Sequence, residues 1–171
     1  MKRGFNMKAH IKGLKETQKK LEQVARDLGG AGQVPGRQLQ SAVARSMLYV
    51  EGKAKKKVPV DRGRLRASIT PKVEQPNHTT IRGIVGSNVK YAPYQEFGTR
   101  PFWPPWEPIY RWALRVVQGD RKAAGALAYK ARLSIAKRGI KAKKYFQEAF
   151  DESQSRIKRE IDRAVKAITS R

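Results

Sequence analysis

Histidine is the side chain best suited to acid–base chemistry near neutral pH, and the chain contains two, His10 and His78. We expect His10 in a helix and His78 beside a turn, and neither has a carboxylate or a serine at a motif spacing. A general base must lie within hydrogen-bonding reach of the group that it deprotonates, so this pattern gives neither histidine a catalytic role. Neither has neighbouring ligands for a metal ion, cysteine is absent, and no glycine-rich phosphate-binding motif occurs. The sequence therefore predicts no catalytic residue, no metal site and no cofactor, and a protein that is not an enzyme.

Positive charge is the dominant chemical feature of the chain. Its 171 residues hold 38 Lys and Arg against 14 Asp and Glu, a formal net charge of +24. Such an excess repels itself unless anions balance it, and nucleic acid, an anionic membrane face and acidic proteins are the usual partners. No apolar run is long enough to span a bilayer, and no apolar stretch follows the basic start. We therefore expect a soluble protein with no signal peptide and no membrane contact.

Two basic clusters lie close together, at the end of an expected helix and in the turn that follows it. Their members are Lys53, Lys55, Lys56, Lys57, Arg62, Arg64 and Arg66. One interpretation is a strip that binds DNA phosphates without reading bases. The other is a helix terminus, where cations are favoured, and an Asp-Arg-Gly turn whose arginines face solvent or a protein interface. We predict that at least one of the two clusters faces DNA.

Aromatic side chains gather just after the middle of the chain, interleaved with prolines that exclude regular structure over residues 98–108. They are Phe102, Trp103, Trp106, Tyr110 and Trp112. Such side chains can cap the core, anchor a partner protein together with neighbouring arginines, or stack on single-stranded bases. The rigid setting favours docking over a core layer.

Helices at both ends of the chain and short strands between them must position these residues. Helical patterns cover about 8–28, 35–57, 109–117, 121–138 and 144–168, and the glycines at 29–32 end the first of them. Alternating or β-branched runs predict strands at about 64–70, 79–85 and 87–94. The first two strands are expected to form a hairpin around Pro76 and Asn77.

The predicted core joins the sheet to the helix at 35–57. It contains Leu65, Ile69, Ile84, Val85, Val89, Tyr91 and Phe97, packed under Val43, Met47 and Val50. The last helix carries an apolar stripe of Phe146, Phe150, Ile157, Ile161 and Val165. One modest domain has little core surface to cover every amphipathic helix, so we expect the first helix and this stripe to gain burial from neighbouring subunits. The expected interface residues are Phe102, Trp103, Trp106, Trp112, Phe146 and Phe150.

Two sequence blocks, KVPVDRGRLRASI at 57–69 and VGSNVKYAPYQEFGTR at 85–100, resemble the tail-component family of long-tailed double-stranded DNA phages. These are neck or tail-completion proteins, similar in kind to gpZ of lambda. The positions that match the family pattern are Pro59, Asp61, Gly63, Leu65, Ser68, Tyr91, Ala92, Glu96, Gly98 and Thr99. Arg62 stands where the pattern has threonine, and Glu96 is a candidate ion-pair partner of Arg64, Arg66 or Arg100.

The resemblance implies an α+β fold, in which a small antiparallel β-sheet packs against a long helix and N- and C-terminal helices flank this core. We expect a single domain over 1–171. It divides into an N-terminal helix and break (1–32), the family core (33–99), a Pro/Trp loop (100–108), an inserted helical hairpin (109–139) and a C-terminal helix (140–171). Either the Pro/Trp loop or the segment 144–150 makes the closing contact of the family fold.

For function, the resemblance implies a structural virion protein without an active site. It would form a ring, a hexamer, in the phage neck, where it completes the tail and joins it to the head around the DNA path. Its partners would be its own copies, the head connector or stopper protein, the tail terminator or tail tube protein, and the DNA backbone without sequence specificity. Assembly would take place in the host cytoplasm. The alternative is a basic nucleic-acid-binding protein, which salt-sensitive DNA retention by a monomer would favour.

Overall fold

The computed structural model describes residues 5–7, 36–77 and 80–169 of the chain. Its elements, in chain order, are β1 (Phe5–Met7), α2 (Gly36–Lys57), α3 (Arg64–Ala67), β2 (Ile69–Asn77), β3 (Thr80–Ser87), α4 (Ala92–Phe97), α5 (Trp106–Val116), α6 (Arg121–Arg138) and α7 (Tyr145–Thr169). The expected α+β class is confirmed. The helix expected at about 8–28, its glycine break and both histidines lie outside the described residues.

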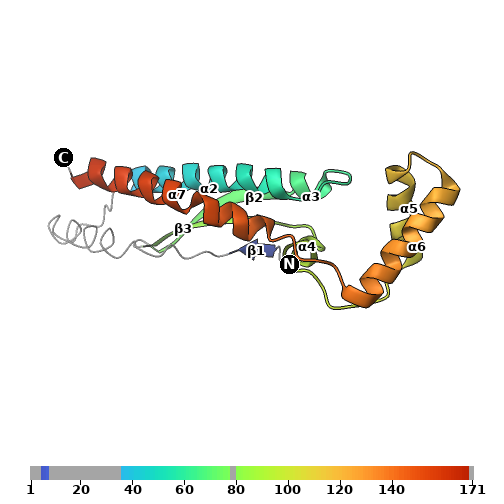
Figure 1. Ribbon diagram of the computed structural model, residues 1–171. Coiled ribbons are helices and arrows are strands. Elements are labelled where there is room, and N and C mark those ends of the chain that lie inside the picture. Colours follow the sequence, from blue (N-terminus) through green and yellow to red (C-terminus); the bar gives the residue numbers. More distant parts are fainter. Residues whose placement is uncertain (1–4, 8–35, 78–79, 170–171) are drawn as a thin grey trace.

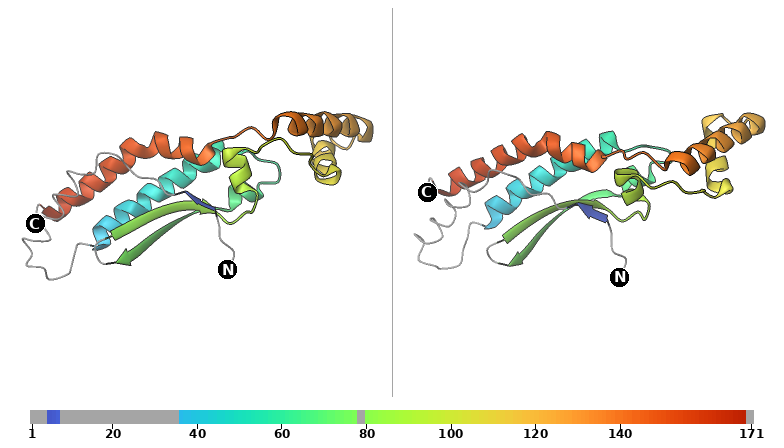
Figure 2. Two further views of the ribbon diagram at one scale, coloured as in Figure 1. Left: turned by 90° about the horizontal axis from the view of Figure 1, so that it is seen from below. Right: turned by 60° about the horizontal axis from the view of Figure 1, so that its bottom comes forward.

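The sheet is antiparallel and has the strand order β1-β3-β2. β2 and β3 form the expected hairpin, in which Ile69 pairs with Ser87, and the short β1 pairs with the other edge of β3. α2 lies between the sheet and α7, and α7 runs antiparallel to α2 (Figures 1 and 2). None of the helices in the described part of the chain combines the length and the hydrophobicity that a membrane crossing requires.

The core lies where α2, the sheet and α7 meet. Met47 and Val50 of α2 are buried together with Ile69 of β2, and Leu65, Ile84, Val85 and Val89 are buried as expected. Val43 is partly buried against the same cluster. Most of the predicted core is therefore confirmed.

The strand expected from Arg64 is wrong over its first residues, because Arg64–Ala67 form the single helical turn α3. The Ala67 N–H donates to the Gly63 carbonyl at 2.8 Å, and β2 begins only at Ile69. Apolar and polar residues that alternate over only four positions are compatible with one helical turn as well as with a short strand. Either structure turns Leu65 toward the core. Leu65 is 4% exposed.

The third strand, expected at about 87–94, is also wrong, because β3 ends at Ser87 and the helix α4 begins at Ala92. The Ser87 hydroxyl accepts a hydrogen bond from the Val89 N–H and so turns the chain away from the sheet. Pro93 then lies in the first helical turn, where its missing N–H costs nothing. Because residues 91–97 are not a strand, Tyr91 and Phe97 point outward, 42% and 63% exposed, and their predicted burial is wrong.

α7 finds its partner within the chain. Phe146, Ile157 and Val165 are buried, and Phe150 and Ile161 pack partly buried against the shared core. The expectation that neighbouring subunits supply part of this burial is therefore wrong for Phe146, Ile157 and Val165, which are buried within the chain. It rested on too little core surface in one modest domain, whereas α2 supplies that surface by packing against the sheet on one side and α7 on another.

α5 and α6 form a helical hairpin that extends away from the rest of the molecule (Figure 1). We name these two helices, residues 106–138, the arm, and the described residues outside 98–144 the body. The arm has a small core of its own, built on Ala113, Ala124 and Ala128 with Trp112 and Leu127 packed against them. Asp120 caps α6 by accepting hydrogen bonds from the N–H groups of Lys122 and Ala123. α6 has the expected bounds, whereas α5 begins at Trp106, so the exclusion of regular structure over 98–108 is wrong at residues 106–108. Pro108 lies in the first turn of α5, where its missing N–H costs nothing.

Candidate functional site

Two chain segments, 98–105 and 139–144, connect the arm to the body, and they cross in close contact. The Thr99 N–H donates to the Ile140 carbonyl at 3.0 Å, and the Thr99 hydroxyl accepts from the Ile140 N–H at 2.9 Å. Gly98 and Gly139 both have positive φ angles, 75° and 73°. A Cβ on Gly98 would lie 2.5 Å from the Ile140 carbonyl oxygen, and a Cβ on Gly139 would collide with the Thr99 carbonyl. The motif residues Gly98 and Thr99 therefore form the joint at the base of the arm.

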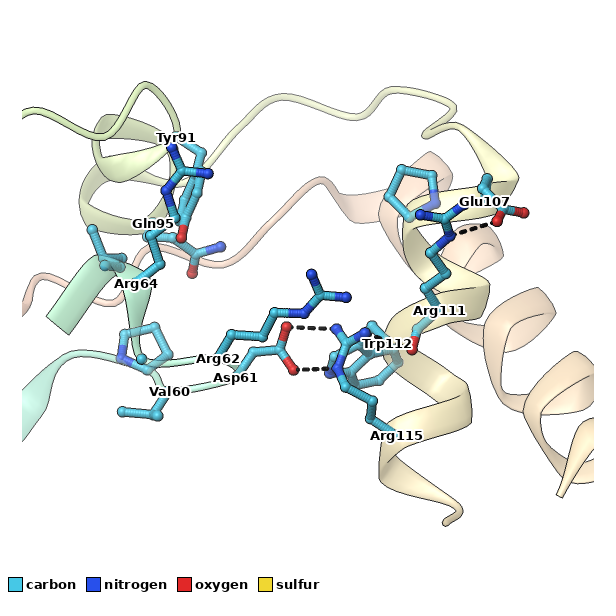
Figure 3. A pocket seen from close by; sticks show the side chains of 14 residues that line it. Val60, Asp61, Arg62, Arg64, Tyr91, Gln95, Glu107, Arg111, Trp112 and Arg115 are labelled. Atoms are coloured by element: carbon cyan, nitrogen blue, oxygen red, sulfur yellow. Dashed lines mark hydrogen bonds and ion pairs between the residues drawn. The ribbon is translucent and has the colours of Figure 1, made fainter. Parts of the chain in front are cut away.

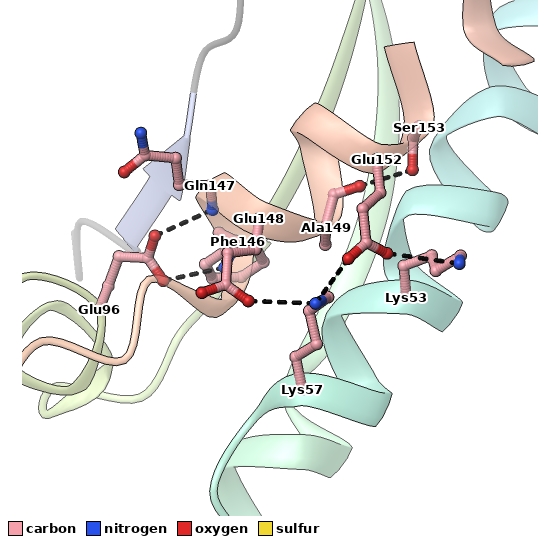
Figure 4. Close-up of polar contacts among 9 residues, drawn as sticks. All are labelled: Lys53, Lys57, Glu96, Phe146, Gln147, Glu148, Ala149, Glu152 and Ser153. Atoms are coloured by element: carbon pink, nitrogen blue, oxygen red, sulfur yellow. Dashed lines mark hydrogen bonds and ion pairs between the residues drawn. The ribbon is translucent and has the colours of Figure 1, made fainter. Parts of the chain in front are cut away.

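Glu96 holds the beginning of α7. Its side chain is fully buried, and its carboxylate accepts hydrogen bonds from the Phe146 N–H at 2.9 Å and the Gln147 N–H at 3.0 Å (Figure 4). Its carbonyl also accepts from the Lys144 N–H. The expected ion pair with Arg64, Arg66 or Arg100 is wrong, because a helix N-terminus, with its unpaired N–H groups and positive dipole end, binds this carboxylate instead. In this chain the segment 144–150 therefore supplies the contact to the motif residue Glu96.

Tyr145 lies beside this contact and is buried with its ring against Phe146. In the described part of the chain its hydroxyl finds no hydrogen-bond partner. Burial, together with the nearby Glu96 carboxylate, raises the pKa of the Tyr145 phenol well above its usual value. Tyr145 therefore stays neutral and serves as a core residue.

The lysine cluster at the end of α2 is largely neutralised by glutamates. Lys57 Nζ lies 3.0 Å from a Glu148 oxygen and 2.7 Å from a Glu152 oxygen, and Lys53 Nζ lies 3.4 Å from Glu152 (Figure 4). The Glu152 and Glu148 carboxylates raise the pKa of Lys57, and Lys57 lowers the pKa of Glu152. Lys55 pairs with Glu51 on its own helix, whereas Lys56 is exposed. Lys53 and Lys57 thus bind α7 to α2.

The arginine cluster lies on the exposed turn and helix that follow α2. Arg62, Arg64 and Arg66 are all exposed. Asp61, in the same turn, forms a two-pronged ion pair with Arg115 of α5, with N···O distances of 3.0 and 2.6 Å (Figure 3). This guanidinium lowers the pKa of Asp61. The turn therefore carries free cations beside a link from the body to the arm.

The aromatic cluster divides between the surface and the arm core. Phe102, Trp103 and Trp106 are exposed by 41%, 56% and 38%. The Arg132 guanidinium lies 4.7 Å from the Trp103 ring and 5.5 Å from the Trp106 ring, and its Nε donates to the Pro104 carbonyl. Cations held over aromatic faces in this way fix the rings in place. We name Phe102, Trp103 and Trp106 the aromatic edge.

The other expected interface residues pack wholly or partly within the chain. Trp112 packs against the arm core, Phe146 is 2% exposed and Phe150 is partly buried in the core of the body. Burial within the chain contradicts the expected interface role of Phe146, whereas Phe150 is only partly buried and its role stays a prediction. Among the described residues, no group of three or more His, Cys, Asp or Glu is arranged to hold a metal ion.

Sequence reasoning missed three contacts that the fold makes at these sites. Arg115 lies 54 positions from Asp61, Arg132 comes 28 positions after Pro104, and the α7 N-terminus lies 50 positions after Glu96. No local spacing connects such pairs. The sequence offered one signal, since Lys144, directly before α7, is not a residue type that caps a helix.

Comparison with known proteins supports the resemblance seen in the motif blocks. Residues 15–98 match the family model HK97-gp10_like, described as "Bacteriophage HK97-gp10, putative tail-component". The match ends at Gly98, so the arm and α7 follow after it. Among curated proteins and among solved structures, no match to the chain was found. Over residues 15–98, just under half of its length, the chain is similar to the HK97-gp10-like family of bacteriophage tail components.

Proposed function

We propose that the protein is a tail-completion protein of the phage neck, which forms a ring of six copies and joins the tail to the head connector around the DNA path. The match of residues 15–98 to a phage tail-component family supports a role in the virion. The finer assignment to the neck rests on the motif blocks at 57–69 and 85–100. On this proposal the chain works through interfaces and carries no reaction.

The observation that carries this proposal is the arm with its exposed aromatic edge. The arm extends away from the body in both views of Figure 2, so it can reach a neighbouring molecule. Trp103 is 56% exposed although Arg132 and the adjacent prolines hold it rigidly. Rigid Trp side chains accompanied by Arg are typical of the residues that contribute most to protein interfaces. If the arm of each copy binds the next copy, the contact is head-to-tail. Head-to-tail contacts form a closed ring when the rotation between successive copies brings the last copy back to the first.

The remaining partners follow from the place of such a ring. One rim would meet the head connector or stopper protein and the other the tail terminator or tail tube protein. DNA passing through would meet exposed cations that bind phosphates without reading bases. Lys56 and Arg66 are exposed and suited to this role, whereas Lys53, Lys55 and Lys57 have carboxylates beside them. The ring would assemble in the host cytoplasm and reside in the virion neck.

Mass photometry and negative-stain imaging of the purified full chain test the ring directly. The wild-type chain should form rings, and Phe102→Ala with Trp103→Ala should shift the population to monomers. Tyr129→Ala is the matched control, because Tyr129 is also 56% exposed on the arm but lies outside the aromatic edge. A wild-type chain that stays monomeric at every concentration, and retains DNA in a salt-sensitive way, would favour the nucleic-acid-binding alternative instead.

A further inference from the structure

A cleft of about 740 Å³ lies between the body and the arm. Residues 59–65 of the turn and α3 form one wall, Tyr91 and Gln95 at α4 extend it, and α5 forms the opposite wall (Figure 3). This volume is in the range of protein sites that enclose a ligand, about 300–1,000 Å³. The α5 wall lies outside the segment that matches the family model, so the arm creates this cleft.

The walls of the cleft carry more positive than negative charge. Four arginines line it, Arg62, Arg64, Arg111 and Arg115, against the carboxylates of Asp61 and Glu107. Both carboxylates are already paired with arginines of α5, Asp61 with Arg115 and Glu107 with Arg111, each at 2.6 Å at the closest approach. No ion pair within the described residues involves Arg62 or Arg64. Figure 3 shows Arg62 extending from the turn toward α5, beside Asp61.

Apolar and aromatic groups make up much of the remaining lining. Val60 and Tyr91 are exposed by 58% and 42%, and Trp112 of α5 faces them across the cleft. The site therefore offers two unpaired guanidinium groups next to apolar surface. This combination suits a peptide that alternates carboxylates with apolar side chains, because a guanidinium binds a carboxylate through two parallel hydrogen bonds.

We propose that this cleft binds an acidic segment of a different protein, with its carboxylates on Arg62 and Arg64. A DNA duplex is a poor occupant, since its major groove alone is about 12 Å wide and the cleft is a small recess between two walls. The inference goes beyond the proposed ring, because a single copy of the chain contains the whole site.

The chain's own carboxylates argue against a second copy as the occupant. Of its 14 Asp and Glu residues, Glu16, Glu22 and Asp27 lie outside the described residues. That segment, 15–27, also holds four Lys and Arg and is not acidic. Each carboxylate within the described residues already has a partner in the chain, as an ion pair, a helix cap, a side-chain hydrogen bond or another polar contact. An acidic segment must therefore come from another protein.

Fluorescence anisotropy with the full chain and three labelled probes tests the proposal. The probes are a peptide of alternating Glu and Leu, the matched Gln and Leu peptide, and a single-stranded oligothymidylate, all at about 0.15 M salt, where long-range attraction is screened. The test variant is Arg62→Gln with Arg64→Gln. The matched control is Arg66→Gln with Arg82→Gln, which removes two exposed arginines of the body that do not line the cleft.

The acidic peptide should bind the wild-type chain, and the neutral peptide should not. The test variant should weaken acidic-peptide binding by about tenfold or more, because two charge-assisted contacts are lost, and the control by less than about twofold. Equal losses in both variants would show diffuse charge attraction and overturn the proposal. If the test variant lost oligothymidylate binding but bound the acidic peptide as the wild type does, the result would overturn the proposal in favour of a phosphate ligand. Mass photometry of the same variants reports ring formation separately, so failure of this site and failure of the ring are distinguishable.

Discussion

The buried carboxylate of Glu96 should be one of the most sensitive positions in the body. α7 begins at Tyr145, directly after Lys144, which has a positive φ of 49°. The ammonium group of Lys144 has no acceptor for the N–H groups of the helix and cannot cap it. The first N–H groups of any helix lack partners within it. Here Glu96 accepts from two of them, those of Phe146 and Gln147. We therefore predict that Glu96→Gln destabilises the protein although it preserves the size and shape of the side chain.

The expected loss follows from the contacts that the substitution changes. Hydrogen bonds to a charged group contribute about 1.5–3 kcal/mol, more than those to a neutral one, and a charge in a buried position at a helix N-terminus contributes up to about 2 kcal/mol. Glu96→Gln removes the charge and turns one acceptor into a donor that faces a backbone N–H. We expect a loss of about 2–4 kcal/mol in the free energy of unfolding. Glu96→Ala should cost at least as much, because it leaves two N–H groups without their acceptor.

Urea denaturation followed by two signals measures this loss. Circular dichroism reports the helices of the whole chain, whereas fluorescence reports the arm and its loop, because all three tryptophans lie at 103, 106 and 112. The midpoint by circular dichroism should fall strongly for Glu96→Gln. Glu107→Gln is the control, since its side chain is 60% exposed and its pair with Arg111 lies on the surface. Such a pair contributes about 0–1 kcal/mol.

A small effect would refute this reasoning. If Glu96→Gln cost no more than Glu107→Gln, the carboxylate would not hold α7, and the motif glutamate would need another explanation. A fluorescence midpoint that moved without the circular dichroism midpoint would place the effect at the arm joint instead of at α7.

Three further predictions follow from the same contacts. Leu65→Ala should cost about 2–5 kcal/mol in a denaturant titration, because Leu65 is 4% exposed in the core; a loss below about 0.5 kcal/mol would reject it as a core residue. Arg115 lowers the pKa of Asp61, so the link between turn and arm is present above the usual Asp pKa of about 3.9 and weakens as the pH falls through the lower folded-state pKa. Tryptophan fluorescence should therefore change at acid pH in the wild type, and a change that persisted in Asp61→Asn would exclude this carboxylate as its source. Replacing Lys55, Lys56 and Lys57 with Gln should lower the slope of log K for DNA against log salt by about 1 at most, since only Lys56 lacks a carboxylate partner in the described residues. A decrease near 3 would show that all three lysines contact phosphates.

Long helices were the most predictable part of the fold. The expected helix at 121–138 has the observed bounds of α6, and those of α2 and α7 differ from expectation by about one residue. A periodic stripe over many residues excludes other structures, because only a helix brings all its members to one face. The short elements were not predictable in this way. Four residues around Leu65 and six from Ala92 satisfy either period, and hydrogen bonds of Ser87 and the position of Pro93 decided the outcome.

The candidate sites were predictable only as residue types. Exposed arginines at 62–66 and a rigid aromatic edge were expected, and both are exposed. The partners of these residues were not predictable. Arg115 contacts Asp61 and Arg132 contacts Trp103 only because the fold brings distant segments together, and no local pattern indicates such pairs. The sequence showed the positive charge of the α2 lysines but not their partners. Lys53 and Lys57 lie against glutamates of α7, which no pattern near the lysines indicates.

Those glutamates do have a sequence signature once α2 and α7 are known to be antiparallel. Arg45, Lys53 and Lys57 are separated by 8 and 4 positions, and their partners Glu160, Glu152 and Glu148 by the same steps in reverse. Equal steps on antiparallel helices keep each pair aligned, because both helices rise by about 1.5 Å per residue. Each exposed pair contributes little free energy, but sliding α7 by one turn would break several of them at once. The mirrored spacing therefore specifies the register in which Phe146 and Ile157 reach the core.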